Sequence, residues 1–311
     1  MGPRDVLFMG SIVIDHVMYV DQLPKVGQSV MTDNFHRFPG GKGSNQAISA
    51  AKFGAETRFF GRIGTEPGSR EMTGLMEQAG IDMSAMLQSS DATVGMCVIL
   101  VEKGTGKNMI VFDPAATLRL TPADIEAHPE VFCAGGLFAL TMEFQRDTVY
   151  AAIRAAHAAG MEILLDPLAI PGGEFPADIP PMVEFIKPNE TEASALTGVE
   201  VRDIATAKEA ARRLRQMGFG TPILSLGEQG ILALRGEEFI EVPRHVVSAV
   251  DSTAAGDVLI GSFLAAYAAH GDFEGALRTA NAAAALSTTK MGAQTSIPTP
   301  EEVKALLEKT R

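Results

Sequence analysis

Asp257 stands at the start of an apolar helical run near the C-terminal end of the chain, in the segment AVDSTAAGDVLIGSFLAAYAA at 249–269. An acidic residue is favoured in the first turn of a helix, because the free N–H groups there carry about half a positive charge. A capping box would need Ser or Thr three residues earlier, where the chain has Ala254. Local capping therefore explains the segment poorly, and the N–H groups of Ala254, Ala255 and Gly256 are open to a larger anion.

A second loop that could contact a ligand is PGGKGSNQA, residues 39–47, where glycines lead directly into a helix. Glycine lets the backbone approach a ligand closely, and Lys42 and Asn45 supply directed donors. The alternative is a flexible strand-to-helix turn that binds nothing. Asp15 and Glu143 each follow an apolar strand, where their oxygens could bind sugar hydroxyls or only close a turn.

Asn189 and Glu192 lie at N-x-x-E spacing in KPNETE, at the start of another expected helix. One helical turn separates them, so both side chains can face the same point. Asn189 is also a good N-cap, and Glu192 stands where a capping box places its acid. On its own, the segment favours the capping interpretation.

Two glycine-containing segments are similar to nucleotide fingerprints without matching them. GTGKN at 104–108 resembles the end of a P-loop, but the Walker pattern requires Gly where the chain has Val101, and Ser or Thr where it has Asn108. GRIGTEPG does not follow the dinucleotide pattern GxGxxG. We therefore expect GTGKN to form a hairpin turn.

The elements that must position these residues alternate between apolar strands and helices. Such an alternation indicates a parallel sheet covered on both faces, with ligands bound at the carboxyl ends of the strands. Two patches with alternating polar residues, about 16–38 and 94–113, do not fit inside that sheet and predict a small antiparallel lid. Three C-terminal helices should begin near Ala255, Asp272 and Thr299. We predict one α/β domain over residues 1–311 with a lid.

Composition limits the classes of partner. The net charge of −12 argues against a nucleic-acid or anionic-membrane surface. No apolar stretch reaches the roughly 18 residues of a membrane span, and Asp15 and His16 interrupt the N-terminal apolar run where a signal peptide needs continuity. We expect a cytoplasmic protein that binds no nucleic acid and no membrane. Cys97 and Cys133 lie in apolar stretches and are expected to be reduced core residues.

Five segments together resemble the ribokinase family of carbohydrate kinases, also called the PfkB family. They are GGKGSNQA, NETE, SLGEQG, DSTAAGD and KMGAQTSIP, and they span essentially the whole chain. The resemblance implies a ribokinase-like α/β fold, in which a predominantly parallel β-sheet is flanked by helices and carries a small antiparallel β lid. It also implies an ATP-dependent kinase that phosphorylates a sugar hydroxyl with the help of Mg²⁺ and K⁺.

The resemblance assigns roles to individual residues. Asp257 would be the general base for the attacking hydroxyl, and Ala254, Ala255 and Gly256 would form an anion hole for the phosphoryl group. The residues that would bind the sugar are Asp15, Gly41, Lys42, Asn45, Glu143 and Asp257. Those that would bind ATP are Asn189, Ser225, Gly227, Gly230 and Asn281. Those that would hold Mg²⁺ are Asn189 and Glu192, and those of the K⁺ loop are Asp251, Thr253, Thr288, Met291, Gly292 and Ser296.

The acceptor is expected to be D-ribose, because the charged and amide groups at the sugar end suit a compact polyol. The chain has no Trp and only three Tyr, so no platform for stacking a nucleobase is evident. Family members commonly carry a GAN-like turn and an NPAPA-like segment, where this chain has FDPAAT and LDPLAI. Asp113 or Asp166 could therefore favour a longer sugar.

Other functions stay open from the sequence alone. Within the family the chain could be a fructokinase, a 2-keto-3-deoxygluconate kinase or a nucleoside kinase. From a different class, it could be a catalytically silent sugar-binding or regulatory module. An exposed apolar face on the lid could pair with its copy, which favours a homodimer.

Overall fold

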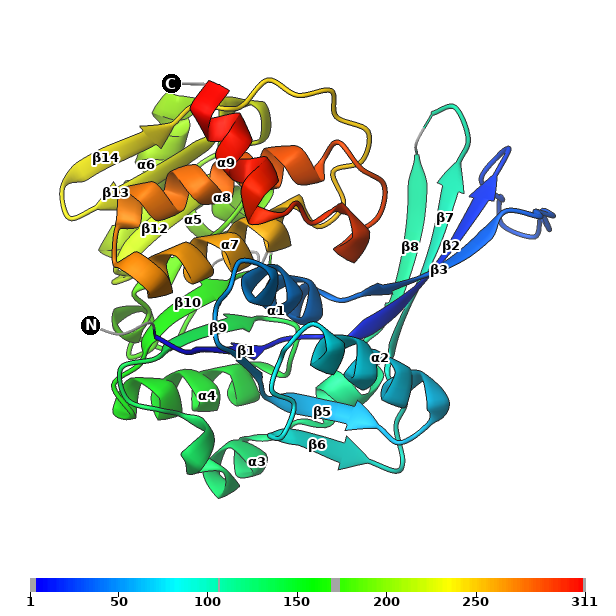
Figure 1. Ribbon diagram of the computed structural model, residues 1–311, viewed down its shortest axis with the longest axis horizontal. Helices are drawn as coiled ribbons and strands as arrows, with labels where there is room; N and C mark the ends of the chain where they lie inside the picture. Colours follow the sequence, from blue (N-terminus) through cyan, green and yellow to red (C-terminus); the bar gives the residue numbers. More distant parts are fainter. Residues whose placement is uncertain (1–3, 106, 169–173, 310–311) are drawn as a thin grey trace.

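The computed structural model describes residues 4–105, 107–168 and 174–309. The body of the molecule is an eight-stranded sheet with helices on both faces (Figure 1). In spatial order its strands are β14 (Glu238–Val242), β13 (Ile231–Arg235), β12 (Thr221–Ser225), β11 (Phe185–Ile186), β10 (Glu162–Asp166), β9 (Leu137–Thr141), β1 (Val6–Met9) and β4 (Thr57–Phe59). The run from β12 to β4 is parallel, and β13 and β14 extend it antiparallel. The prediction of a mostly parallel sheet is confirmed.

Helices cover both faces of this sheet because its central strands are apolar on both sides. Along β1, Val6 and Phe8 enter one core while Leu7 and Met9 enter the other. The helices are α1 (Lys42–Lys52), α2 (Pro67–Gln78), α3 (Pro122–Ala127), α4 (Arg146–Ala158), α5 (Glu190–Thr197), α6 (Ile204–Gln216), α7 (Ala255–His270), α8 (Phe273–Ser287) and α9 (Pro300–Lys309). Short 3-10 helices are η1 (Ala115–Arg119), η2 (Pro129–Val131), η3 (Pro180–Met182), η4 (Gly227–Gln229) and η5 (Gln294–Ser296). The three C-terminal helices begin where the sequence predicts them.

Helices α1 and α7 cross in close contact on one face of the sheet (Figure 1). Their approach depends on Gly261, since a Cβ there would lie 2.3 Å from the carbonyl oxygen of Gln46. Helix α7 is buried on most of its circumference, which its almost uninterrupted apolar sequence allows. The pair thus forms a rigid base beneath the N-terminal end of α7.

A second sheet projects from the body on one side (Figure 1). It contains β3 (Phe35–Gly40), β2 (Val13–Val20), β7 (Gly95–Glu102) and β8 (Asn108–Asp113), in that order. The pairs β2–β3 and β7–β8 are antiparallel, as the sequence predicts, but the central pair β2–β7 is parallel. After β2 and β3, the chain returns to the body, forms α1 and α2 there, and only then enters β7. Strands β2 and β7 therefore both run from the body outward. We call this sheet the lid; that lid and body form one domain over 1–311 stays a prediction.

Three smaller features complete the comparison with the sequence-based expectations: the start of β3, the turn between β7 and β8, and a small additional sheet. The strand β3 begins only at Phe35, near the end of the patch 16–38 that the sequence assigns to the lid. The hairpin between β7 and β8 turns at GTGKN, although Gly106 lies outside the described residues. A further two-stranded sheet joins β5 (Gly61–Gly64) to β6 (Met86–Ser89).

The expectation that both cysteines belong to the core is wrong. Cys97 is half-buried on the lid, and Cys133 is exposed. Phe132 takes the inward position in the loop before β9, so the neighbouring Cys133 points outward. Within the described ranges, no helix has both the length and the apolar character needed to cross a membrane.

Candidate active site

The N-terminal end of α7 is uncapped by side chains, as the sequence predicts. Ala254 is the N-cap residue in a left-handed conformation with φ of 61°, which is unusual for a residue other than Gly or Asn. The Ala255 N–H donates to the carbonyl of Ser252 at 3.2 Å, so it is already engaged. In the described part of the chain, the N–H groups of Ala254 and Gly256 have no such acceptor and are the ones open to an anion.

Asp257 lies in the first turn of α7 and is only 8% exposed. Its Oδ2 accepts a hydrogen bond from Asn45 Nδ2 at 3.0 Å, and its Oδ1 accepts one from Gln46 Nε2 at 3.2 Å. The same Gln46 nitrogen donates to Asp166 Oδ2 at 2.9 Å. Gln46 therefore bridges two buried carboxylates, a role that its place in GGKGSNQA does not reveal.

Burial raises the pKa of Asp257 to about 7, and the neighbouring charge of Asp166 adds to the rise. Lys42 and the hydrogen bonds from Asn45 and Gln46 lower the same pKa but do not offset burial. A carboxylate with a pKa near neutrality is well matched to general-base catalysis at physiological pH. Its environment thus gives Asp257 the pKa that a general base at physiological pH would need.

Lys42 is the cation at the centre of this site. Its Nζ lies 3.4 Å from Asp166 Oδ2 and 3.7 Å from Glu192 Oε1. Burial alone would lower the pKa of Lys42, but Asp166, Asp257, Glu192 and Glu143 outweigh it and raise that pKa above its ordinary value. The lysine is therefore a permanent positive charge that links α1 to the carboxyl ends of the central strands.

The other expected sugar-binding residues surround Lys42 on the lid side. Glu143 Oε2 accepts from the Ser11 N–H at 3.1 Å and from Thr141 Oγ1 at 2.8 Å. Burial raises the pKa of Asp15, on the lid strand β2, to about 6. Gly41 caps α1 with φ of 99°, and a Cβ there would lie 2.6 Å from the Ser11 carbonyl oxygen. Only glycine fits this junction between lid and body.

Two buried polar atoms at this end have no hydrogen-bond partner among the described residues. They are Asn45 Oδ1 and Ser11 Oγ. A buried polar group without a partner costs free energy, so these atoms are candidates to bind ligand hydroxyls.

The segments FDPAAT and LDPLAI, which differ from the family pattern, have different positions. Asp166 of LDPLAI lies in the site, whereas Asp113 of FDPAAT accepts from the Ala115 N–H at 3.0 Å and closes a turn. Ala169 and Ile170 of LDPLAI lie outside the described residues.

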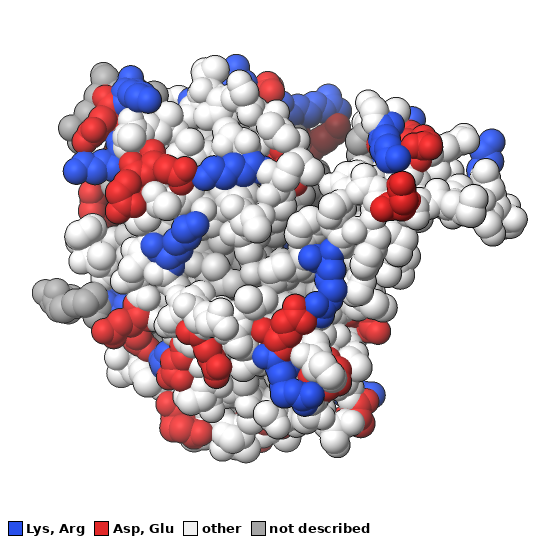
Figure 2. All heavy atoms as spheres, turned by 45° about the vertical axis from the view of Figure 1, so that its right-hand side comes forward, with Lys and Arg blue, Asp and Glu red and all other residues white. Residues whose placement is uncertain are grey.

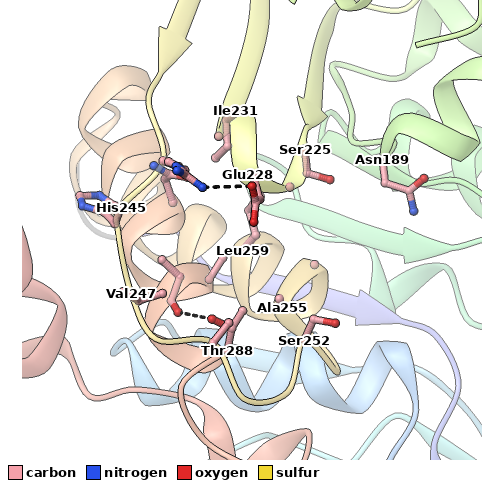
Figure 3. A pocket seen from close by; sticks show the side chains of 18 of the residues that line it. Asn189, Ser225, Glu228, Ile231, His245, Val247, Ser252, Ala255, Leu259 and Thr288 are labelled. Carbon is pink, nitrogen blue, oxygen red and sulfur yellow. Dashed lines mark hydrogen bonds and ion pairs between the residues drawn. The ribbon is translucent and has the colours of Figure 1, made fainter. Parts of the chain in front are cut away.

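A cavity of about 560 Å³ opens on the other side of the α7 N-terminus (Figure 3). It receives side chains from the ends of β12 and β13, from α7 and α8, and from the segment before α7. The expected ATP-binding residues all line it: Asn189, Ser225, Gly227, Gly230 and Asn281. Figure 3 shows Asn189 and Ser225 at one end and Ser252 and Ala255 beneath them. The charged and titratable lining residues that sequence reasoning missed are Lys187, Glu190, Glu228, Arg244 and His245.

The N-x-x-E segment forms a complete capping box. Asn189 Oδ1 accepts from the Glu192 N–H, and Glu192 Oε2 accepts from the Asn189 N–H, both at 2.9 Å. The capping interpretation is thus confirmed. Glu192 Oε1, which faces Lys42, is left as the oxygen available to an ion or its water. Burial raises the pKa of Glu192.

The residues expected around K⁺ gather in two adjoining turns. Asp251 Oδ1 accepts from the Thr253 N–H at 2.9 Å, and its Oδ2 accepts from the Gly292 N–H at 2.9 Å. The N–H groups of Val250 and Asp251 both donate to the Thr288 carbonyl. The second turn is closed by bonds from Thr295 Oγ1 to the Met291 carbonyl and from Ser296 Oγ to the Ala293 carbonyl. In the described ranges, no group of three or more His, Cys, Asp or Glu side chains could hold a metal ion.

Comparison with known proteins finds a family whose pattern covers most of the chain and solved structures with the same fold. The pattern described as pfkB family carbohydrate kinase matches residues 3–300. A ribokinase from Haemophilus influenzae is 34% identical over 96% of this chain and 97% of its own. A deoxyribokinase from Salmonella typhi is 32% identical over 97% and 98% of the two chains. The structure of Arabidopsis thaliana ribokinase complexed with ribose and ATP superposes with a TM-score of 0.87 at 26% identity, covering 99% of each chain.

Proposed function

The chain belongs to the pfkB family of carbohydrate kinases, and we propose that it transfers the γ-phosphoryl group of ATP to D-ribose. It is a ribokinase-like sugar kinase. The observation that carries the proposal is the position of Asp257, a buried carboxylate with a pKa of about 7 between the nucleotide cavity and the polar groups around Lys42. We therefore expect the product to be ribose 5-phosphate.

The proposed reaction uses groups that converge at the start of α7. Asp257 takes the proton of the acceptor hydroxyl as its oxygen attacks phosphorus, and the N–H groups of Ala254 and Gly256 stabilise the charge on the phosphoryl oxygens. Lys42 and Asn45 hold the sugar beside the base. ATP occupies the cavity that Asn189, Ser225, Gly227, Gly230 and Asn281 line.

Two ions complete the proposal. Mg²⁺ prefers oxygen ligands, and Glu192 Oε1 with the remaining capacity of Asn189 Oδ1 fits it directly or through water. When bound, Mg²⁺ neutralises charge on the ATP phosphates. The turns at 251–253 and 288–296 supply carbonyl oxygens that suit K⁺.

The acceptor follows from the polar atoms at the sugar end. Asn45 Oδ1 and Ser11 Oγ are buried without partners, and Asp15 supplies a further carboxylate. A site built to bond hydroxyls discriminates strongly against analogues that lack them. Because a deoxyribokinase is 32% identical to the chain, 2-deoxy-D-ribose is the second candidate acceptor.

A sugar panel tests the acceptor. ADP formation is measured with D-ribose, 2-deoxy-D-ribose, fructose, 2-keto-3-deoxygluconate and adenosine, and D-ribose should give the highest kcat/KM. A preference of about tenfold for fructose or adenosine would overturn the ribose assignment, since one missing or added contact changes discrimination by about that much. Absence of any sugar-dependent ADP formation would instead support a silent binding module.

Asp257→Asn tests the base. The variant should bind ribose and ATP but lose about 10²-fold or more in kcat, because general-base catalysis typically contributes that much. Asp272→Asn is the matched control, since Asp272 is the exposed N-cap of α8 and Asn also caps helices well. Near-normal turnover of Asp257→Asn would remove Asp257 from the mechanism.

We also propose that the protein is a homodimer in the cytoplasm, with small molecules rather than nucleic acids or membranes as its other partners. The lid edge strand β8 exposes every one of its residues, including Ile110, Val111 and Phe112. An exposed apolar edge strand is prone to pair with a second copy. In Figure 2 the lid stands out from the body, and much of its surface in that view is uncharged.

A further inference from the structure

Lys187 is a buried lysine in the wall of the nucleotide cavity. It follows β11 directly, and its backbone N–H donates to the Leu165 carbonyl at 3.0 Å, which places it at the carboxyl end of a parallel strand. The residue is only 4% exposed, and it lines the cavity together with Gly256. The ammonium group is therefore enclosed by protein on most sides and open toward the ligand space.

The ammonium group of Lys187 has no direct partner in the part of the chain that the structure describes, although its charge lowers the pKa of Glu192 from a distance. Neither a hydrogen bond nor an ion pair reaches its Nζ there, whereas the nearby Lys42 pairs with Asp166 and Glu192. Burying a charged ammonium without a partner is costly. A charge of this kind is retained at a stability cost when a ligand supplies the missing anion.

The ammonium lies directly against the start of α7. A Cβ added at Gly256 would lie 3.0 Å from Lys187 Nζ. Gly256 precedes the base Asp257 and lines the cavity, and its N–H is one of those open to an anion. The N-terminus of α7 and the ammonium group of Lys187 therefore lie next to the same point of the cavity, and each of them favours negative charge there.

We propose that Lys187 binds the terminal phosphoryl group of ATP and remains bound to it during transfer. The inference rests on the proposed function, since it assigns a residue to that same reaction. The bond between the γ-phosphorus and the β–γ bridging oxygen breaks, the electron pair stays on ADP, and the acceptor oxygen bonds to phosphorus while its proton goes to Asp257. Lys187 takes no part in this proton transfer and neutralises the charge on the equatorial oxygens.

Calorimetric titration of Lys187→Met tests the assignment without turnover. The ligands are the β,γ-imido analogue of ATP, ADP and adenosine. The analogue should bind about tenfold to a hundredfold more weakly than to the wild type, in keeping with loss of a hydrogen bond to a charged group, while adenosine binding stays unchanged and ADP loses much less. Unchanged affinity for the analogue, or an equal loss for all three ligands, would overturn the proposal.

Thermal stability separates ligand binding from a structural role. Without nucleotide, Lys187→Met and Lys187→Gln should melt no lower than the wild type, because each removes a buried charge that makes no hydrogen bond and no direct ion pair. Both should show a smaller rise in Tm with the ATP analogue. A lower Tm for both variants without ligand would identify a structural lysine and refute the proposal.

A surface lysine provides the control. Lys208→Met changes the net charge equally at a site on α6 outside the cavity, where Lys208 pairs with Glu241, and should leave all three affinities unchanged. The proposed function itself is tested separately, by sugar-dependent ADP formation with the wild type. Its failure would therefore be distinguishable from failure of the Lys187 assignment, which the binding constants report.

Discussion

Asp166→Asn should shift the pH dependence of the kinase toward acid. Asp166 and Asp257 each accept a hydrogen bond from Gln46 Nε2, at 2.9 and 3.2 Å, so the two accepting oxygens are no more than about 6 Å apart. Two unit charges at about 6 Å interact by about 3 kcal/mol when the effective dielectric constant is about 20, which corresponds to about two pKa units. The Asp166 charge raises the pKa of Asp257, so its removal lowers that pKa from about 7.

The expected shift of the pH–rate profile is smaller than this change in the pKa of Asp257. Asp257 must be ionised to act as a base, so kcat/KM falls as the pH drops through its pKa. In Asp166→Asn the pKa of Asp257 falls below that of Asp15, which is about 6 and does not depend on Asp166. Protonation of Asp15, which we propose binds the sugar, then limits the rate, and the acid limb should move from about pH 7 to about pH 6.

Initial rates of ADP formation at saturating ATP, with ribose varied between pH 5 and 9, give the profile. Asp178→Asn is the control, because Asp178 forms an exposed ion pair with Arg154 outside the site. An acid limb that stays in place, or moves toward higher pH, would refute the electrostatic coupling through Gln46.

Two further predictions concern the ion and the lid. Activity should be higher in potassium than in carefully K⁺-free sodium buffer, and Asp251→Asn should reduce the difference, because Asp251 joins the turns at 251–253 and 288–292; identical rates in both buffers would rule out a role for K⁺. Val111→Lys, which charges a side chain that is 70% exposed on β8, should convert the dimer to a monomer in light scattering, whereas Leu118→Lys in η1 should not. A wild-type protein that is monomeric at micromolar concentration would contradict the dimer proposal.

The parts of the molecule that sequence reasoning could predict are those specified by local patterns. The apolar runs predict the parallel sheet, and the spacing of Asn189 and Glu192 predicts the capping box, because the interacting residues are three positions apart. The absence of a side-chain cap at Ala254 is equally local.

The parts that could not be predicted depend on residues far apart in the chain. Gln46 contacts partners 120 and 211 positions away, so its type alone cannot indicate that it bridges Asp166 and Asp257. Lys187 could not be singled out either, since only the folded arrangement of the described residues shows that its buried ammonium group makes no hydrogen bond and no direct ion pair. The parallel pairing of β2 with β7 also joins distant segments, and no hairpin turn marks it.

Gly261 touches no proposed ligand, yet it constrains how this enzyme can be engineered. It sits one helical turn after Asp257 on α7, against the backbone of Gln46 on α1. A methyl group there would force α1 and α7 apart and would shift Asp257 relative to the side-chain amides of Asn45 and Gln46. Catalysis is sensitive to displacements of about 1 Å. Libraries that seek new acceptors can therefore vary exposed lid positions away from Asp15 and Gly41, while substitutions at this remote glycine should be avoided as carefully as those at Asp257 itself.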